Sequence, residues 1–104
     1  MNLQYFYDQI CEELHGAKDY IINAMEIRAM DTNWAGTLVG MSAVELTHAD
    51  NLYKMFEQYY ALITKSYGTP DKVPDYITCM KEKITKMYLE ETAAIKIMHE
   101  TYKK

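Results

Sequence analysis

Gly-Thr-Pro-Asp-Lys-Val-Pro-Asp, residues 68–75, decides the fold, because this stretch holds both prolines of the chain. Proline lacks a backbone N–H and interrupts a helix, although the first turn of a helix accepts it. A second break lies at residues 31–33, Asp-Thr-Asn, whose side chains can cap a new helix. The two breaks predict helices at residues 4–30, 33–67 and 74–102.

The two connections between the predicted helices are short, which makes neighbouring helices antiparallel. The chain is therefore predicted to be all-α, with an antiparallel helical hairpin followed by a third long helix, in a single domain over residues 1–104. Three helices bury only a thin core, and ten tyrosines and eight methionines leave apolar surface to spare. We therefore expect further copies of the same chain to complete the bundle.

The composition argues against several classes of function. The net charge is −4, whereas a nucleic-acid partner needs a basic surface. The first residues lack the basic region and apolar run of a signal peptide, and no stretch is apolar for long enough to span a bilayer. We therefore expect a cytoplasmic protein with neither a nucleic-acid nor a membrane partner.

Polar residues interrupt the apolar face that spacings of three and four residues select on each predicted helix. On the first helix this face is Phe6, Ile10, Glu13, Ala17, Tyr20, Ala24 and Ile27. On the second it is Leu38, Met41, Glu45, His48, Leu52, Met55, Tyr59 and Leu62. On the third it is Ile77, Met80, Ile84, Met87, Glu91, Ala94, Met98 and Tyr102. The charged or titratable exceptions need compensation, because burying an unpaired carboxylate is costly.

These exceptions, Glu13, Glu45 with His48, and Glu91, are expected to lie at one level of the bundle. If the helices fold back near residues 32 and 71, a rise of about 1.5 Å per residue puts all four side chains within about one to two turns of each other. Buried ion pairs or hydrogen bonds could compensate such groups, and so could a shared cation. A common level favours the cation.

Glu45 and His48 form a Glu-x-x-His pair, and positions i and i+3 project from one face of a helix. A carboxylate together with an imidazole suits iron, manganese or zinc. Di-iron helical bundles use this pair on facing helices, with a lone glutamate on the others. The predicted metal ligands are therefore Glu13, Glu45, His48 and, less centrally, Glu91.

Around these ligands the sequence resembles the ferritin-like superfamily. Residues 45–52, Glu-Leu-Thr-His-Ala-Asp-Asn-Leu, look like the Glu-x-x-His-Ala-x-x-Leu motif on the second helix of rubrerythrins. Residues 12–14, Glu-Glu-Leu, followed by Tyr20, are similar to the first helix of encapsulated ferritins, in which a tyrosine follows the glutamate ligand. The resemblance covers residues 5–60.

The resemblance implies a ferritin-like bundle in which each chain supplies half of a di-iron centre about a twofold axis. Glu13, Glu45 and His48 of both chains would bind the iron, and Tyr20 would be a candidate catalytic residue near it. The implied activity is that of a ferroxidase, which oxidises Fe²⁺ to Fe³⁺ in iron storage or protection from oxidative stress. An encapsulin-type shell is an implied partner. The chain departs from complete ferritins by lacking a fourth helix and a second Glu-x-x-His, since Ala94 stands three residues after Glu91.

Two other interpretations remain open. One is a non-enzymatic oligomeric scaffold or interaction module, in which buried polar residues set the helix register. The other is a single-metal site within one chain, built from the same four candidate ligands. Of the remaining residues, His15 is expected at a surface or interface and His99 in solvent, and Trp34 is expected to anchor packing at the start of the second helix.

Overall fold

The computed structural model describes residues 2–104, and its regular structure over that range is entirely helical. The elements are α1 (Leu3–Ile27), α2 (Thr32–Ser66), the short 3-10 helix η1 (Pro70–Lys72) and α3 (Asp75–Lys103). Each long helix begins and ends within three residues of the predicted bounds. The prediction of an all-α chain with three long helices is confirmed.

Local side chains explain where the helices start. The Asn2 and Asp31 side chains each accept a hydrogen bond from the backbone N–H three residues further on, at 2.9 and 2.8 Å respectively. These bonds satisfy donors that the first turn of a helix leaves without a partner. After α2, Gly68 adopts a backbone φ of 90°, which residues that carry a Cβ rarely adopt. Pro74 then immediately precedes α3.

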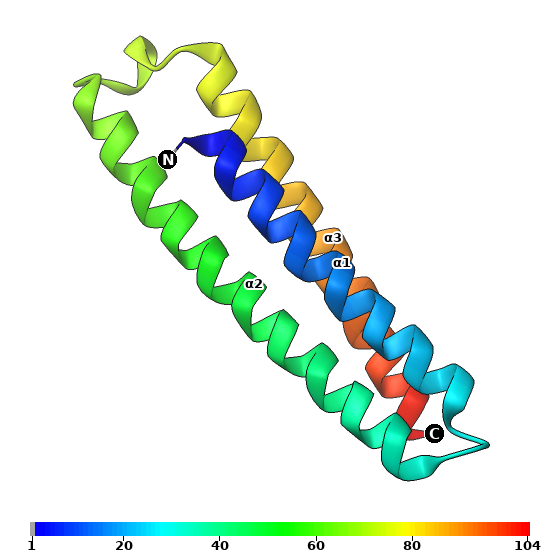
Figure 1. Ribbon diagram of the computed structural model, residues 1–104. Coiled ribbons are helices and arrows are strands. Elements are labelled where there is room, and N and C mark those ends of the chain that lie inside the picture. The colour runs from blue at the N-terminus through cyan, green and yellow to red at the C-terminus, as the bar shows by residue number, and fades with distance from the viewer. Residues whose placement is uncertain (1) are drawn as a thin grey trace.

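Helix α1 packs against both of the other long helices, whereas α2 and α3 contact each other at few places (Figure 1). Helices α1 and α3 run in the same direction, and α2 is antiparallel to both (Figure 1). The result is a rod with principal extents of 58 × 19 × 15 Å. Because α2 is covered mainly by α1, a long face of α2 stays open to solvent.

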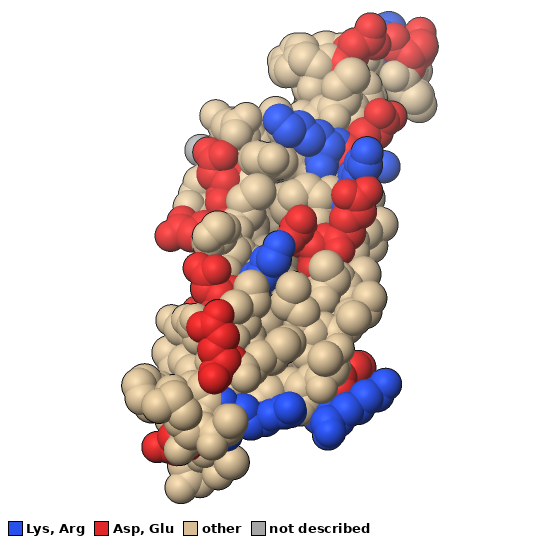
Figure 2. Space-filling model, turned by 90° about the vertical axis from the view of Figure 1, so that its right-hand side faces the viewer, with Lys and Arg blue, Asp and Glu red and all other residues tan. Residues whose placement is uncertain are grey.

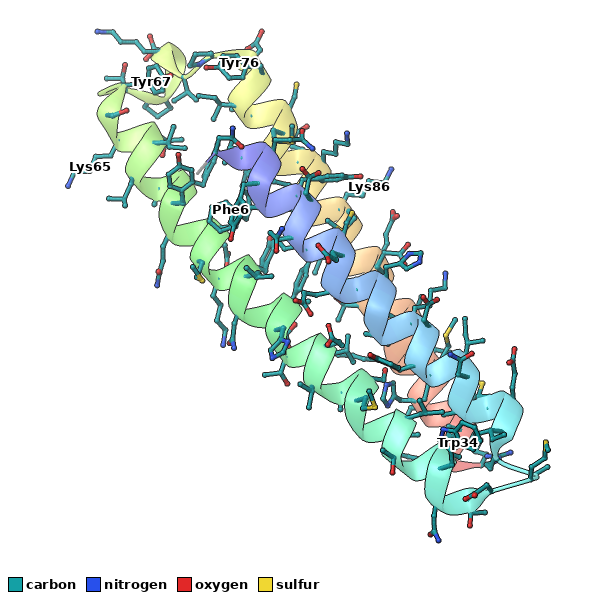
Figure 3. All side chains as sticks on the ribbon, viewed as in Figure 1. Phe6, Trp34, Lys65, Tyr67, Tyr76 and Lys86 are labelled. Atoms are coloured by element: carbon teal, nitrogen blue, oxygen red, sulfur yellow. The ribbon has the colours of Figure 1, made fainter. Side chains whose placement is uncertain are left out.

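The core is built on one face of α1. Its buried residues are Leu3, Phe6, Ile10, Leu14, Ala17, Ile21 and Ala24. Phe6 points from α1 toward α2, and its ring centroid lies 6.0 Å from that of Phe56 (Figure 3). The predicted face had Glu13 and Tyr20 in place of Leu14 and Ile21, and this part of the prediction is wrong. Glu13 and Tyr20 are half-buried at the edge of the core instead.

Two sets of residues, each repeating every seven positions, run along α2 one position apart. The inner series is buried and consists of Ala35, Ser42, Ala49 and Phe56. The outer series is exposed and consists of Trp34, Met41, His48, Met55 and Leu62. A seven-residue repeat keeps residues on nearly the same face of a helix, so each series forms a stripe along α2.

The predicted core face of α2 is wrong at four of its members, Met41, His48, Met55 and Leu62, because these belong to the outer series. Met41, Met55 and Leu62 are 40%, 46% and 68% exposed. Trp34, which was expected to anchor packing at the start of this helix, is 58% exposed. Spacing alone favoured the larger apolar side chains, whereas the contact with α1 uses small ones that let the two helices approach closely.

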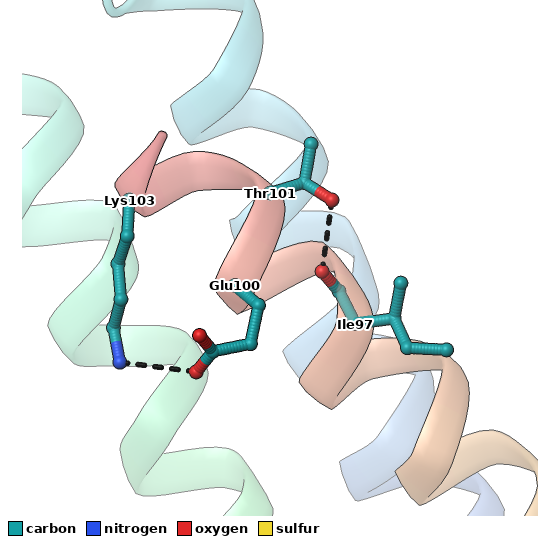
Figure 4. A network of polar contacts seen from close by, with 4 residues as sticks. All are labelled: Ile97, Glu100, Thr101 and Lys103. Carbon is teal, nitrogen blue, oxygen red and sulfur yellow. Dashed lines mark hydrogen bonds and ion pairs between the residues drawn. The ribbon is translucent and has the colours of Figure 1, made fainter.

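The surface mixes both signs of charge. On the side shown in Figure 2, acidic side chains run down the molecule in a broken line with lysine and arginine side chains between them. At the end of α3, Lys103 Nζ lies 3.1 Å from Glu100 Oε1, and the Thr101 hydroxyl donates to the Ile97 carbonyl at 3.0 Å (Figure 4). Within residues 2–104, no helix has the length and apolar character that crossing a membrane requires.

Candidate metal centre

Glu13 on α1 meets Glu45 and His48 on α2 where the two helices face each other. Each residue offers one ligand atom, and these three atoms all lie within 4.8 Å of one another. The expected common level of these three side chains is therefore confirmed. Their expected deep burial is not, because Glu13 and Glu45 are half-buried and the His48 side chain is 50% exposed.

Glu13 presents a buried carboxylate oxygen to the centre. Oε2 of Glu13 has no hydrogen-bond partner in the described part of the chain, and its 3.4 Å contact with Nδ1 of His48 is an ion pair only when that imidazole is protonated. A buried polar atom without a partner costs free energy, which a cation or a donated proton would recover. This oxygen therefore suits a metal ligand.

Glu45 shows the effect of two carboxyl groups in contact. Its pKa is raised, first by a hydrogen bond with the Glu13 carboxyl, then by burial and by the negative charge of Glu13. His48 lowers the pKa of Glu45 and so opposes these effects. Two carboxyl groups held this close favour a shared proton or a shared cation.

Gly16 on α1 lies next to the Glu45 side chain. A Cβ at position 16 would lie 3.5 Å from Oε2 of Glu45, which is an ordinary van der Waals distance. Glu45 therefore lies against the backbone of α1 at this position, and an alanine at position 16 would also fit.

Tyr20 lies beside Glu45 in an open pocket. The pocket has a volume of about 490 Å³ and is lined by Tyr20, Thr37, Gly40, Met41, Val44 and Glu45. Of these lining residues, Glu45 is a candidate ligand and Met41 belongs to the outer series. The pocket therefore adjoins both the candidate centre and the exposed stripe of α2.

Glu91 is not brought into this group. It is half-buried on α3 and lines a groove between α1 and α3 together with Cys11, His15 and Lys18. Residues 11, 15 and 18 share one face of α1, whereas Glu13 and Gly16 lie on another. Glu91 and the candidate centre therefore lie against different faces of α1, and the four-ligand site within one chain is not assembled.

His99 was expected in solvent, and that prediction is wrong. Its Nε2 lies 2.8 Å from the hydroxyl of Ser42, which in turn donates to the Ala17 carbonyl at 2.6 Å. The imidazole must then be the donor to the Ser42 oxygen. Burial, followed by the charge of Lys103, lowers the pKa of His99. This contact connects all three helices. Because the Ser42 hydroxyl already donates its proton to the Ala17 carbonyl, we interpret the contact as structural.

Two carboxylates and an imidazole are suitable ligands for iron, manganese or zinc. Three protein ligands leave coordination positions open for water, substrate or a residue of another chain. His48 is both a candidate ligand and a member of the exposed outer series. The centre is therefore open to solvent on the side of His48.

In comparisons with known proteins, no family model, curated protein or solved structure matches the chain. The likeness to ferritin-like proteins therefore depends on the motif residues alone. The case for a function depends on how Glu13, Glu45 and His48 are arranged.

Proposed function

We propose that this chain binds iron through Glu13, Glu45 and His48, and that two copies together form a di-iron carboxylate centre that oxidises Fe²⁺ to Fe³⁺. The observation that carries the proposal is the meeting of two carboxylates and an imidazole on facing helices, with one carboxylate oxygen buried and without a hydrogen-bond partner among the described residues. A cation would compensate that oxygen and relieve the repulsion between the carboxylates.

The ligand set supports iron as the substrate. Carboxylate oxygens with a single imidazole per helix pair are the ligands of di-iron bundles, whereas structural zinc sites rely on cysteine and histidine. Negative charge near the metal favours the trivalent over the divalent ion. Oxidation of Fe²⁺ at such a centre would serve iron storage or protection from oxidative stress, and manganese or zinc are the alternative metals.

The outer series supports a second copy of the chain as the partner. Its exposed side chains are apolar except at His48, and they are symmetric about it, with Met41 and Met55 seven positions to either side. Antiparallel pairing of two α2 helices would bury these side chains against each other and align opposed helix dipoles. The two His48 side chains would then lie at the twofold axis and bring both sets of three ligands together.

Tyr20 has a supporting role in this proposal. It shares a pocket with Glu45, and its phenol can hydrogen-bond a water or carboxylate at the centre. Glu13 and Glu45 supply the anionic ligands, and His48 supplies the neutral nitrogen. The raised pKa of Glu45 means that metal binding competes with a proton, so iron affinity should increase with pH.

The direct test adds Fe²⁺ without oxygen, admits air and follows the ferric absorption band. Glu45→Gln and His48→Ala should each lower the initial rate at least about tenfold, because each removes a ligand. Glu90→Gln and His15→Ala are matched controls, since both residues are exposed and lie outside the centre. Unchanged rates in both ligand variants would overturn the proposal.

The exposed apolar stripe alone would also suit an oligomeric scaffold without a metal. A scaffold predicts stable self-association, no stoichiometric iron, manganese or zinc, and no response to chelators. A single-metal site that uses only Glu13, Glu45 and His48 of one chain predicts one ion per monomer. Metal content measured together with oligomer mass separates these two alternatives from a shared di-iron centre.

A further inference from the structure

Tyr53 on α2 and Tyr88 on α3 form a stacked pair at one of the few places where these helices touch. The ring centroids are 4.0 Å apart and the planes differ by 4°. The neighbouring pair of Tyr53 and Phe56 is tilted, with centroids 5.6 Å apart. Face-to-face contact at 4.0 Å brings carbon atoms of the two phenol rings next to each other.

Two hydrogen bonds hold this pair in a reciprocal arrangement. The Tyr53 hydroxyl and the Thr85 hydroxyl on α3 lie 3.0 Å apart. The Tyr88 hydroxyl donates to Oδ1 of Asp50 on α2 at 2.5 Å. Each hydroxyl therefore contacts a residue of the opposite helix that stands three positions, or about one turn, before the other tyrosine. Both hydroxyls are thus hydrogen-bonded across the gap between α2 and α3.

The surroundings make these two rings favourable sites for oxidation. A positive charge that develops on one ring can be shared with the ring stacked on it. The Asp50 carboxylate next to Tyr88 is negative and stabilises such a charge electrostatically. Both rings are half-buried, so a small oxidant can still reach them. Their fixed proximity also favours reaction with each other over reaction with another chain.

We propose that Tyr53 and Tyr88 are a site of oxidative cross-linking that joins α2 to α3. Each phenol loses one electron and one proton, and the two oxidised rings form a carbon–carbon bond between positions next to the hydroxyl groups. The ring hydrogens at those positions then restore the hydroxyls, so the product lacks two hydrogens in total. With hydrogen peroxide as the oxidant, the two electrons and two protons convert one peroxide into two waters.

The cellular source of activated peroxide would be the iron centre, and that source depends on the proposed function. The reactivity of the pair does not. The bond would close a loop between residues 53 and 88 and connect the two helices that otherwise touch least. By analogy with a disulfide across a loop of this length, the midpoint of thermal unfolding should rise on the order of 10 °C.

The test uses an oxidant that needs no iron. The metal-free chain, at low concentration, is illuminated with tris(bipyridine)ruthenium(II) and persulfate, which accepts the two electrons and becomes two sulfate ions. The products are followed by dityrosine fluorescence, intact mass and proteolytic mapping. The expected main product is a monomer lighter by two hydrogens, in which the peptide containing Tyr53 is joined to the peptide containing Tyr88.

Variants separate this pair from the other tyrosines. Tyr88→Phe keeps the stacked ring but removes its hydroxyl, and should lower the yield of the cross-linked monomer at least about tenfold. Tyr76→Phe is the matched control: Tyr76 is 71% exposed and hydrogen-bonds Tyr67, so this second pair would react first if exposure governed the reaction. Circular dichroism checks that each variant is folded.

Three results would overturn the proposal: equal monomeric product in Tyr88→Phe and the wild type, a link between Tyr67 and Tyr76 as the main product, or no link within the chain. Because the assay contains no iron, its failure leaves the proposed metal centre standing. Conversely, absence of iron oxidation with an intact Tyr53–Tyr88 link would contradict the metal centre alone.

Discussion

The inner and outer series of α2 have the same seven-residue period and opposite environments. The inner series is mostly small, and its members Ala35, Ser42 and Ala49 are fully buried. The outer series is mostly large, and its apolar members are between 40% and 68% exposed. Small side chains let α1 approach closely, whereas the large ones have no cover within the chain. On this helix, therefore, the apolar character of a side chain does not decide whether it is buried within one chain.

The candidate centre lies at the border between the two series. Glu45 faces Glu13 across the closely packed contact with α1, and His48 belongs to the outer series. One side of the centre is therefore covered by α1 of the same chain, and the side of His48 is open to solvent. A partner that covers the outer series would complete both the apolar packing and the ligand set.

The largest effect on stability should come from the inner series. Phe56→Ala removes a ring that is 1% exposed and packs against Phe6, so the free energy of unfolding should fall by about 3–5 kcal/mol. Met55→Ala, its neighbour on the outer series, should cost less than ~1 kcal/mol in the monomer. Urea unfolding at concentrations that keep the chain monomeric measures both. Equal losses would contradict the distinction between the series.

Charges on the outer series should weaken the proposed self-association through α2. The double variant Met41→Glu and Met55→Glu should raise the dissociation constant of the dimer at least about 100-fold, or ~2.7 kcal/mol, with unchanged helix content. Leu89→Glu with Ile97→Glu is the matched control, because these α3 residues are 58% and 66% exposed but lie outside the outer series. Sedimentation velocity measures the effect, and a dimer that survives the first variant but not the control would reassign the interface to α3.

A smaller effect is expected at the polar member of the inner series. Ser42→Ala removes the bond to the Ala17 carbonyl and leaves Nε2 of His99 without its partner, which should cost about 1–2 kcal/mol. Ser66→Ala, at the exposed end of α2, should change stability by less than ~0.5 kcal/mol. Thermal unfolding compares the two. No difference between them would show that the three-helix contact contributes nothing.

The smallest effect concerns Glu45 in the metal-free chain. Its pKa is raised in the folded state, so the folded state holds this proton more tightly, and that contribution to stability is lost as pH rises through the raised pKa. Glu45→Gln should therefore stabilise the metal-free chain at neutral pH, by less than ~1 kcal/mol because solvent screens the group. The gain should vanish as pH falls below the ordinary value of 4.5.

Unfolding in the presence of a chelator, at acidic and at neutral pH, measures the Glu45→Gln effect. With iron bound the sign should reverse, because the variant then lacks a ligand. A stabilisation that is independent of pH would show that the Glu13–Glu45 contact is not the cause.

The helices were predictable because their boundaries depend on local chemistry. Pro70, Pro74 and the cap at Asp31 act on the backbone next to them, and no distant contact is needed to interpret them. The level shared by Glu13, Glu45 and His48 followed from the same boundaries, because two turns and a constant rise fix which residues lie opposite each other.

The face of α2 that meets α1 was not predictable in the same way. Spacing identified a stripe containing Met41 and Met55, but the adjacent stripe of small residues is the one that α1 covers. The choice depends on how closely two backbones can approach, which is a property of the pair of helices. The same limit applies to Glu91, whose level was expected but whose groove faces another side of α1.

The central claim is that two chains share one di-iron centre. Native mass and metal content, measured on a single iron-loaded sample, test it most directly. The account predicts a dimer or a larger even-numbered assembly with two iron ions per pair of chains, and loss of that iron in His48→Ala but not in His15→Ala. A monomer without stoichiometric iron, manganese or zinc would contradict it.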